Sequence, residues 1–187
     1  MPTKSHLTHL ECPECGATYD PQQLQTFCQG ILSGQPCRSP LLARYDLSRI
    51  GSELTPSIIR ARSRGMWRWA ELLPVQDPNC RITLGEGDTP LLTIPRTGAR
   101  LNLLHLYVKD ESVNPTGSFK ARGLAVAVSK AIELGVRAFV IPTAGNAGGA
   151  LAAYAAPCGA QAHVFMPQDA PRPNLREVKA SGADLHL

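Results

Sequence analysis

Lys120 is the residue whose setting most strongly suggests chemistry in this sequence. It follows Ser118 and Phe119 in the turn-rich stretch ESVNPTGSFKARG, just before an expected helix. A lysine in the first turn of a helix opposes the helix dipole, so an ordinary solvated lysine gains nothing from this position. Lysine amines held out of water or near positive potential act as Schiff-base nucleophiles toward carbonyl ligands. We therefore expect Lys120 to be a reactive amine rather than a surface charge.

Four cysteines near the start of the chain suggest a metal site. Cys12 and Cys15 form the knuckle CPEC, and two thiolates on one turn can reach a single tetrahedral Zn²⁺. Cys28 and Cys37 have eight residues between them, whereas a usual zinc ribbon has two. We expect the glycines of the intervening QGILSGQP to let the chain loop back, so that all four cysteines bind one structural zinc ion.

The remaining thiols and the nearby imidazoles have weaker claims to chemistry. Cys80 and Cys158 have no ligand spacing, and we interpret them as ordinary free thiols. His6 and His9 could replace a cysteine ligand, although a terminal tail is the simpler interpretation.

Composition excludes several classes of protein. The 187 residues are 43% apolar and 18% charged, which is globular composition. The net charge of +4 comes without a Lys/Arg run or a basic aromatic patch, so nucleic acid is not the expected partner. The chain starts without a signal-peptide core and has no apolar run that could span a membrane. We expect a cytoplasmic protein that binds a small molecule, with no membrane partner.

Three regions of the sequence differ in composition, and the last of them contains Lys120 and must position it. Residues 1–45 are Cys-rich and predict a small zinc-ribbon-like module, 46–80 predict a helical linker, and 81–187 predict an α/β domain. Hydrophobic periodicity and turn residues in the last region predict the following elements. The strands are 103–110, 137–142, 162–167 and 183–187, and the helices are 120–135, 146–159 and 172–182.

This alternation predicts right-handed crossovers and a parallel sheet with flanking helices. Ligands of such sheets bind beyond the carboxyl ends of the strands, where PTAGN (142–146) and PQDAPRP (167–173) lie. We expect Asn146 to cap the helix that follows PTAGN, a helix whose N-terminus attracts negative charge. The sequence ends as a strand begins, which predicts either a fragment or a fold completed by a second chain.

Three motifs together resemble one enzyme family. NPTGSFKARG and PTAGNAGGALAAYAA resemble the pyridoxal-phosphate (PLP) enzymes of the tryptophan synthase β fold, known as PLP fold type II. Adding GEGDTPLL (85–92), the chain is most similar to threonine synthase, and the similarity runs from about residue 65 to the end. The resemblance implies PLP as cofactor and an amino acid as substrate.

The resemblance also implies roles for particular residues. Lys120 matches the lysine that binds PLP covalently, Phe119 packs beside the cofactor, and Asn146 bonds the phenolic oxygen of the PLP ring. The loop that receives the substrate carboxylate matches Thr143, Ala144, Gly145 and Ala147. Ala144 stands where the family often has a hydroxyl residue, which leaves a backbone role there. Glu86 and Thr89 are weaker candidates for substrate contacts.

The implied activity is that of a PLP-dependent carbon–oxygen lyase. It would convert O-phospho-L-homoserine and water to L-threonine and phosphate, with Lys120 as general base. The alternatives are a threonine or serine dehydratase, a cysteate-synthase-like enzyme, and a truncated, inactive PLP-fold fragment that keeps a zinc module. The last draws support from the missing Gly-rich loop that cups the PLP phosphate in the family. We therefore expect weak PLP binding by this chain alone, and either a homo-oligomer or a complementing downstream chain.

Overall fold

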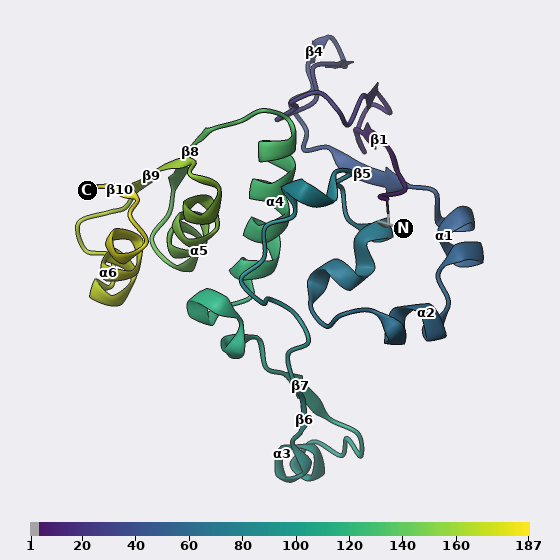
Figure 1. Cartoon of the computed structure of the whole chain (residues 1–187), viewed down its shortest axis with the longest axis vertical. Helices are drawn as coiled ribbons and strands as arrows, with labels where there is room; N and C mark the ends of the chain where they lie inside the picture. Colours follow the sequence, from purple (N-terminus) through teal and green to yellow (C-terminus); the bar gives the residue numbers. More distant parts are fainter. Residues whose placement is uncertain (1–3) are drawn as a thin grey trace. The chain divides into compact units, whose positions relative to one another are not determined.

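The structure is a computed structural model that describes residues 4–187 (Figure 1). The chain divides into two compact units. The first unit comprises the chain up to Ser63 together with 67–81 and 129–136. The second unit comprises 64–66, 82–128 and 137–187. Each unit is described by itself.

The first unit is built on short antiparallel strands. A three-stranded sheet has the order β2-β1-β5, and a separate hairpin pairs β3 with β4. The strands are β1 (Leu7–Glu11), β2 (Thr18–Tyr19), β3 (Ile31–Leu32), β4 (Gln35–Pro36) and β5 (Leu42–Tyr45). Strands this short bury little apolar surface, so the unit needs further stabilisation.

Short helices follow these strands along the chain. They are α1 (Leu47–Glu53), α2 (Pro56–Ala61), η1 (Met66–Leu72) and η2 (Pro78–Cys80). The Asp46 carboxylate accepts a hydrogen bond from the Arg49 amide at 2.9 Å and so caps α1. Within this unit, the Arg62 guanidinium forms two hydrogen bonds with the buried Glu71 carboxylate, at 2.5 and 2.8 Å.

The second unit begins with a strand pair that differs from the sequence prediction. β6 (Leu91–Thr93) pairs antiparallel with β7 (Tyr107–Lys109), and α3 (Pro95–Arg100) lies between them. The strand predicted over 103–110 is therefore three residues long. Asn102 has a φ of 55°, and the Leu103 amide bonds back to the Gly98 carbonyl at 2.8 Å. Residues 101–106 thus form the turn that ends α3.

The predicted α/β alternation is confirmed along the chain from Lys120 onward, with ends that shift by a few residues. The elements are η3 (Glu111–Val113), η4 (Pro115–Gly117), α4 (Lys120–Glu133), β8 (Ala138–Pro142), α5 (Asn146–Ala155), η5 (Ala156–Cys158), β9 (Gln161–Phe165), α6 (Arg172–Ala180) and β10 (Asp184–His186). Gly135, with a φ of 87°, follows α4 as expected of a C-terminal stop. The helix predicted to reach 159 ends earlier, because η5 carries Pro157.

The sheet is parallel, as predicted, with the order β10-β9-β8. Its core consists of Val164, Met166, Ala170 and Val178, with Ile141 packed against it. Alternate residues point to the other face, where Val140 is 69% exposed and Phe165 47% exposed. Figure 1 shows α5 and α6 beside this sheet.

One capping prediction is wrong. Gly145 is the N-cap of α5, and Asn146 is its first helical residue. No side chain caps this helix. The side-chain oxygen Oδ1 of Asn146 instead accepts a hydrogen bond from Nδ2 of Asn174 at 3.2 Å, so the Asn146 side chain turns toward α6 rather than back to its own backbone.

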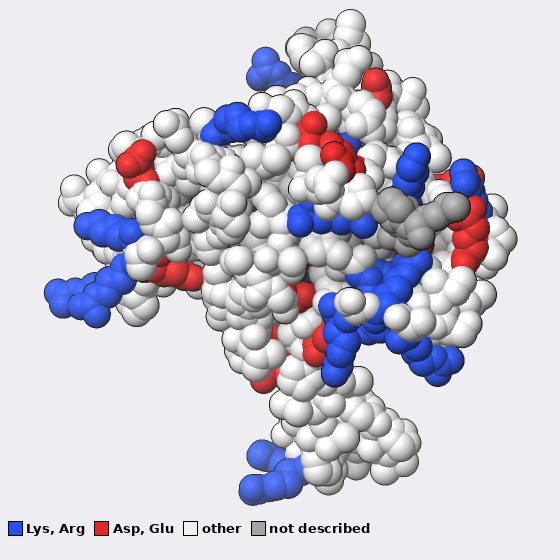
Figure 2. All heavy atoms as spheres, viewed as in Figure 1, with Lys and Arg blue, Asp and Glu red and all other residues white. Residues whose placement is uncertain are grey.

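The surface carries charged side chains of both signs (Figure 2) and several exposed large apolar side chains, such as Leu104 and Val140. Figure 2 shows both basic and acidic side chains on the face that it draws. Within residues 4–187, no helix combines the length and the apolarity needed to cross a bilayer.

Candidate active site and thiol cluster

Lys120 is the first residue of α4, as the sequence predicts. Its backbone amide donates to the Ser118 hydroxyl at 3.3 Å, and its ammonium lies 4.4 Å from the centre of the Phe119 ring. Cation and ring at this distance attract each other. Lys120 is half-buried while Phe119 is 58% exposed, so the ring forms an outer wall beside the amine.

The loop before Lys120 is held in an uncommon backbone conformation. Thr116 and Gly117 have φ values of 63° and 64°, in the left-handed region. This region costs a β-branched residue such as threonine more than it costs glycine. The Gly117 amide bonds the Asn114 carbonyl at 2.9 Å, which closes the turn. The turn, η4, packs against α5, and the segment carrying Lys120 is thereby brought beside the helix that carries the TAGN loop.

A partly buried hydrogen-bond network lies at the start of α4, and sequence reasoning missed it. Arg122 Nε donates to Glu111 Oε2 at 2.6 Å, and its Nη2 donates to Oε1 at 2.8 Å. Thr89 Oγ1 donates to Oε1 at 2.6 Å, and Asn114 Nδ2 donates to Oε2 at 2.8 Å. The hydrogen bond from Arg122, followed by that from Thr89, lowers the pKa of Glu111 to about 2.

The segment GEGDTP contributes a buried carboxylate to the second unit. Glu86 is fully buried, and its Oε2 accepts from the Tyr154 hydroxyl at 2.6 Å and from the Leu84 amide at 3.0 Å. Burial and then the bond to Glu86 raise the pKa of Tyr154. The next residue, Gly87, donates its amide to Asn114 Oδ1 at 3.1 Å. Glu86 and Thr89 therefore hold internal contacts in this structure.

The TAGN loop lies where β8 ends and α5 begins. The Thr143 hydroxyl accepts from the Gly145 amide at 3.2 Å, which forms a tight turn. The Thr143 amide bonds the Phe165 carbonyl at 2.9 Å and so ties the loop to β9. Ala144 and Asn146 are exposed, and Ala147 is half-buried. The loop thus presents backbone at a helix N-terminus, where anions bind.

Gly148 allows α5 to approach the sheet closely. A Cβ atom on Gly148 would lie 2.6 Å from Val164 Cγ1, 2.7 Å from Thr143 Cγ2 and 2.9 Å from Met166 Cε. Only glycine fits such a contact without displacement of its neighbours. Because Gly148 has no side chain, the start of α5 and the TAGN loop can lie close to β9.

The predicted site residues of the second unit fall on two neighbouring segments. Phe119 and Lys120 lie at the start of α4, and the residues of 143–147 lie at the start of α5. Among the residues that sequence reasoning missed, Glu111 and Arg122 belong to the very stretch that flags Lys120. Opposite charges eleven positions apart gave a faint signal, and no local pattern indicated Asn174.

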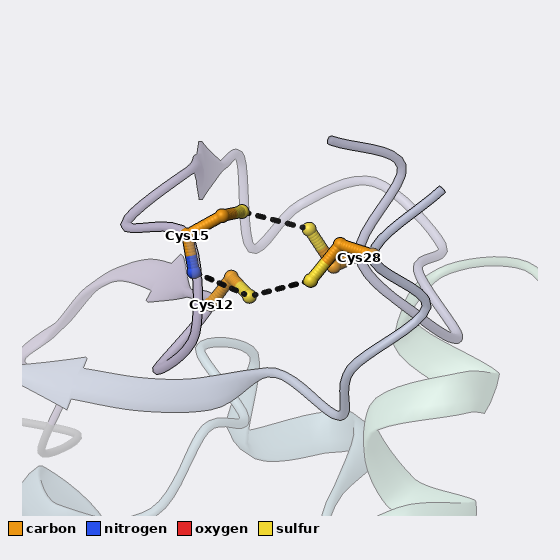
Figure 3. A group of neighbouring side chains, drawn as sticks. Cys12, Cys15 and Cys28 are labelled. Atoms are coloured by element: carbon orange, nitrogen blue, oxygen red, sulfur yellow. Dashed lines mark hydrogen bonds between the residues drawn. The ribbon is translucent and has the colours of Figure 1, made fainter. Parts of the chain in front are cut away.

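The four predicted metal ligands converge in the first unit. The sulfur atoms of Cys12, Cys15, Cys28 and Cys37 all lie within 4.8 Å of one another. The sulfur atoms of Cys12 and Cys37 lie 3.6 Å apart, and those of Cys15 and Cys28 lie 3.4 Å apart. Figure 3 shows the labelled thiols pointing toward one another. Four sulfurs bound tetrahedrally to zinc stand about 3.8 Å apart, given Zn–S bonds of about 2.3 Å.

The eight residues between Cys28 and Cys37 form the β3–β4 hairpin, which explains the unusual spacing. Ser33 and Gly34 have φ values of 50° and 77°, as the two central residues of a tight hairpin turn require. The Cys37 amide then bonds the Gly30 carbonyl at 2.9 Å. A Cβ on Gly30 would lie 3.1 Å from Cys15 Sγ, so this glycine gives room to the sulfur atoms.

Donors already surround these sulfur atoms. The amides of Cys15 and Gly30 donate to the sulfurs of Cys12 and Cys28, at 3.5 and 3.3 Å. The Tyr19 hydroxyl lies 3.1 Å from Cys28 Sγ. Such contacts stabilise thiolates and orient them toward a metal.

Comparison with protein families gives the α/β region an identity. Residues 82–187 match the family described as pyridoxal-phosphate dependent enzymes. The chain belongs to this family. The match includes the Lys120 segment and the TAGN loop, and the parallel sheet agrees with it.

Among the curated relatives of this chain are threonine synthases. The threonine synthase of Methanocaldococcus jannaschii is 38% identical over 157 residues, which is 84% of this chain and 37% of the relative. The threonine synthase of Methanosarcina acetivorans is 38% identical over 160 residues, 85% of this chain and 37% of the relative. The chain thus spans little more than a third of the length of these relatives.

A solved structure supports the fold assignment. The chain is similar to a crystal structure of a PLP-dependent aspartate racemase, with a TM-score of 0.50 and 31% identity. The similarity covers 52% of this chain and 31% of that protein. The predicted PLP fold type II is thereby confirmed for the α/β region.

Proposed function

We propose that the chain is part of a PLP-dependent lyase of the threonine synthase type, which converts O-phospho-L-homoserine and water to L-threonine and phosphate. The observation that carries this proposal is Lys120 at the start of α4, beside the turn that packs against α5. The identity of 38% to two threonine synthases supports the same substrate class.

The donor set of the second unit fits PLP. Lys120 offers an amine to the aldehyde of the cofactor. The N-terminus of α5 offers positive potential and backbone donors to an anionic group. When bound, PLP supplies an electron sink that stabilises negative charge at the substrate Cα.

The residues of the chain have separate tasks in this proposal. Lys120 holds the cofactor and, once its amine is free, removes the proton from Cα. The loop of Thr143, Ala144, Gly145 and Ala147 holds the substrate carboxylate, and Asn146 contacts the cofactor ring. Phe119 covers one side of the amine and limits the access of water. These roles require Lys120 to stay beside Cα through successive proton transfers.

Covalent trapping tests the role of Lys120. The chain is incubated with PLP and reduced with borohydride, and the modified lysine is located by peptide mass spectrometry. We expect the label on Lys120 because it is the lysine placed at the loop–helix junction. Lys120→Ala is expected to lose this label, whereas Lys179→Ala, at an exposed position of α6, keeps it. Equal labelling of Lys120 and of exposed lysines such as Lys179 would refute the assignment.

We also propose that Cys12, Cys15, Cys28 and Cys37 hold one structural zinc ion in a module of residues 1–45, in a reducing, cytoplasmic setting. The supporting observation is the distance of at most 4.8 Å between any two of the sulfur atoms. Structural zinc replaces the apolar core that so short a module lacks.

Metal content tests this second proposal. We expect about one zinc ion per chain by elemental analysis, and its removal by a chelator is expected to unfold the module. Cys28→Ser should lower the zinc content sharply, while Cys158→Ser, outside the cluster, should retain it. Retention of full zinc content by Cys28→Ser would exclude the four-thiol site.

A further inference from the structure

We propose that Glu111 and Arg122 form a clamp that positions Lys120 for its reaction. This inference rests on the proposed function, since it gives the lysine a supporting structure. Neither residue is assigned a direct contact with cofactor or substrate, so both are positioning residues.

The geometry of the pair is that of a strong ion pair. The guanidinium binds both carboxylate oxygens in parallel, at 2.6 and 2.8 Å. Each oxygen has a second donor, from Thr89 on one side and Asn114 on the other. Exposed single ion pairs contribute little, but bidentate pairs within a network are the exception. Here both side chains are at least two-thirds buried, at 25% and 32% exposure.

The pair joins three segments of the second unit. Thr89 precedes β6, and Arg122 lies in the first turn of α4. Between them along the chain, Glu111 begins η3 and Asn114 follows its last residue. Arg122 Nη2 also donates to Thr89 Oγ1 at 3.1 Å. Thr89, Glu111 and Arg122 are therefore each hydrogen-bonded to the other two. Asn114 extends it to the Gly87 amide at 3.1 Å.

The position of Arg122 on the helix gives the clamp its effect on Lys120. Residues two apart on an α-helix point to nearly opposite sides. Arg122 therefore anchors one side of the first turn and leaves Lys120 facing the other. Lys120 itself has only weak contacts, which are a hydrogen bond of 3.3 Å from its backbone amide to the Ser118 hydroxyl and the contact of its ammonium with the Phe119 ring. Its placement then depends on the anchored turn.

Hydrogen exchange of the full chain tests the clamp without any cofactor. In Glu111→Gln we expect amides of 85–90 and 114–122 to exchange about tenfold faster, as loss of a charge-assisted bond implies. Exchange in β9 should stay unchanged. Arg122→Lys keeps the charge but loses the two-pronged geometry, and it should behave in the same way. Arg49→Gln, which breaks an exposed pair with Glu53, is the control and should leave these amides unaffected.

A matched pair of variants separates the hydrogen bond from packing. Thr89→Val keeps the shape but removes the donor to Glu111, and Thr89→Ser keeps the donor. We expect Thr89→Val to exchange as fast as Glu111→Gln at these amides, and Thr89→Ser to keep the slow exchange of the unaltered chain. Unchanged exchange at 114–122 in both Glu111→Gln and Thr89→Val would overturn the clamp. Faster exchange spread equally over β9 would also overturn it, because the pair would then stabilise the fold in general.

Trapping with PLP and borohydride connects the clamp to chemistry. In the unaltered chain we expect the label on Lys120, and in Glu111→Gln and Arg122→Lys we expect the ratio of label on Lys120 to label on Lys179 to fall about tenfold. An unchanged ratio would overturn the positioning role. If the unaltered chain shows no preference for Lys120, the proposed function fails, and the exchange experiment alone then decides whether the clamp orders this turn.

Discussion

Glu111 illustrates how one side chain can organise several segments. Its two oxygens accept four hydrogen bonds, from Arg122, Thr89 and Asn114. The carboxylate is satisfied only when ionised, because a protonated carboxyl group would have to give up an acceptor position. Its charge state is thus linked to the order of the loops around Lys120.

The lowered pKa of Glu111 predicts how stability depends on pH. The pKa falls from 4.5 to about 2, first because of Arg122. The ionised group therefore contributes its full stability above pH 4.5, and this contribution is lost as the pH falls through 2. We expect Glu111→Gln to unfold more easily than the unaltered chain at pH 7 and the difference to shrink between pH 4.5 and 2.

Urea unfolding at a series of pH values measures this difference. Asp169→Asn, a change at an exposed loop position, serves as the control and should follow the unaltered chain. Parallel stability curves for the Glu111→Gln variant and the unaltered chain over the whole range would contradict the prediction.

At the scale of elements, α5 depends on small residues for its place against the sheet. Seven of its ten residues are buried, and a Cβ atom on Gly148 would lie only 2.6 Å from Val164 of β9. The helix carries the TAGN loop at one end and Tyr154, the partner of Glu86, near the other. A displacement of α5 would move both ends.

Two glycine-to-alanine changes should act in opposite directions. Gly148→Ala places a Cβ within 3 Å of three side chains, and we expect it to destabilise the protein by about 1–3 kcal/mol. Gly123→Ala, in α4 with nothing within 4 Å of its Cβ, should stabilise it by about 0.5–1 kcal/mol. Thermal unfolding of both variants checks the pair. Destabilisation by both would show that the space around the Cβ atom does not decide the effect.

The elements could be predicted where local patterns determine them. The βα alternation from Lys120 onward follows from periodicity and from stops such as Gly135, and it is confirmed. The strand predicted from 103 failed because Asn102 and Gly98 form a helix-ending turn that hydrophobicity conceals. The capping role of Asn146 failed because a partner from α6, Asn174, takes its side chain.

At the scale of the whole molecule, the chemistry is divided between the two units. The thiol cluster lies in the first unit and Lys120 in the second. Both were predictable because their residues are marked by short motifs. The Glu111–Arg122 clamp was not, because it depends on folded distances and on a third segment that supplies Thr89. The sheet of the second unit keeps Val140 and Phe165 exposed, a feature that its sequence pattern does not reveal.

The close approach at Gly148 has a genetic consequence. Every amino acid that a single nucleotide change can put in place of glycine carries a Cβ atom, and at this position that atom meets Val164, Thr143 and Met166. No missense change is therefore conservative here, and even alanine, the mildest, enters occupied space. In a deep mutational scan every missense change at this codon should score below the synonymous changes, although no catalytic or binding role is proposed for Gly148.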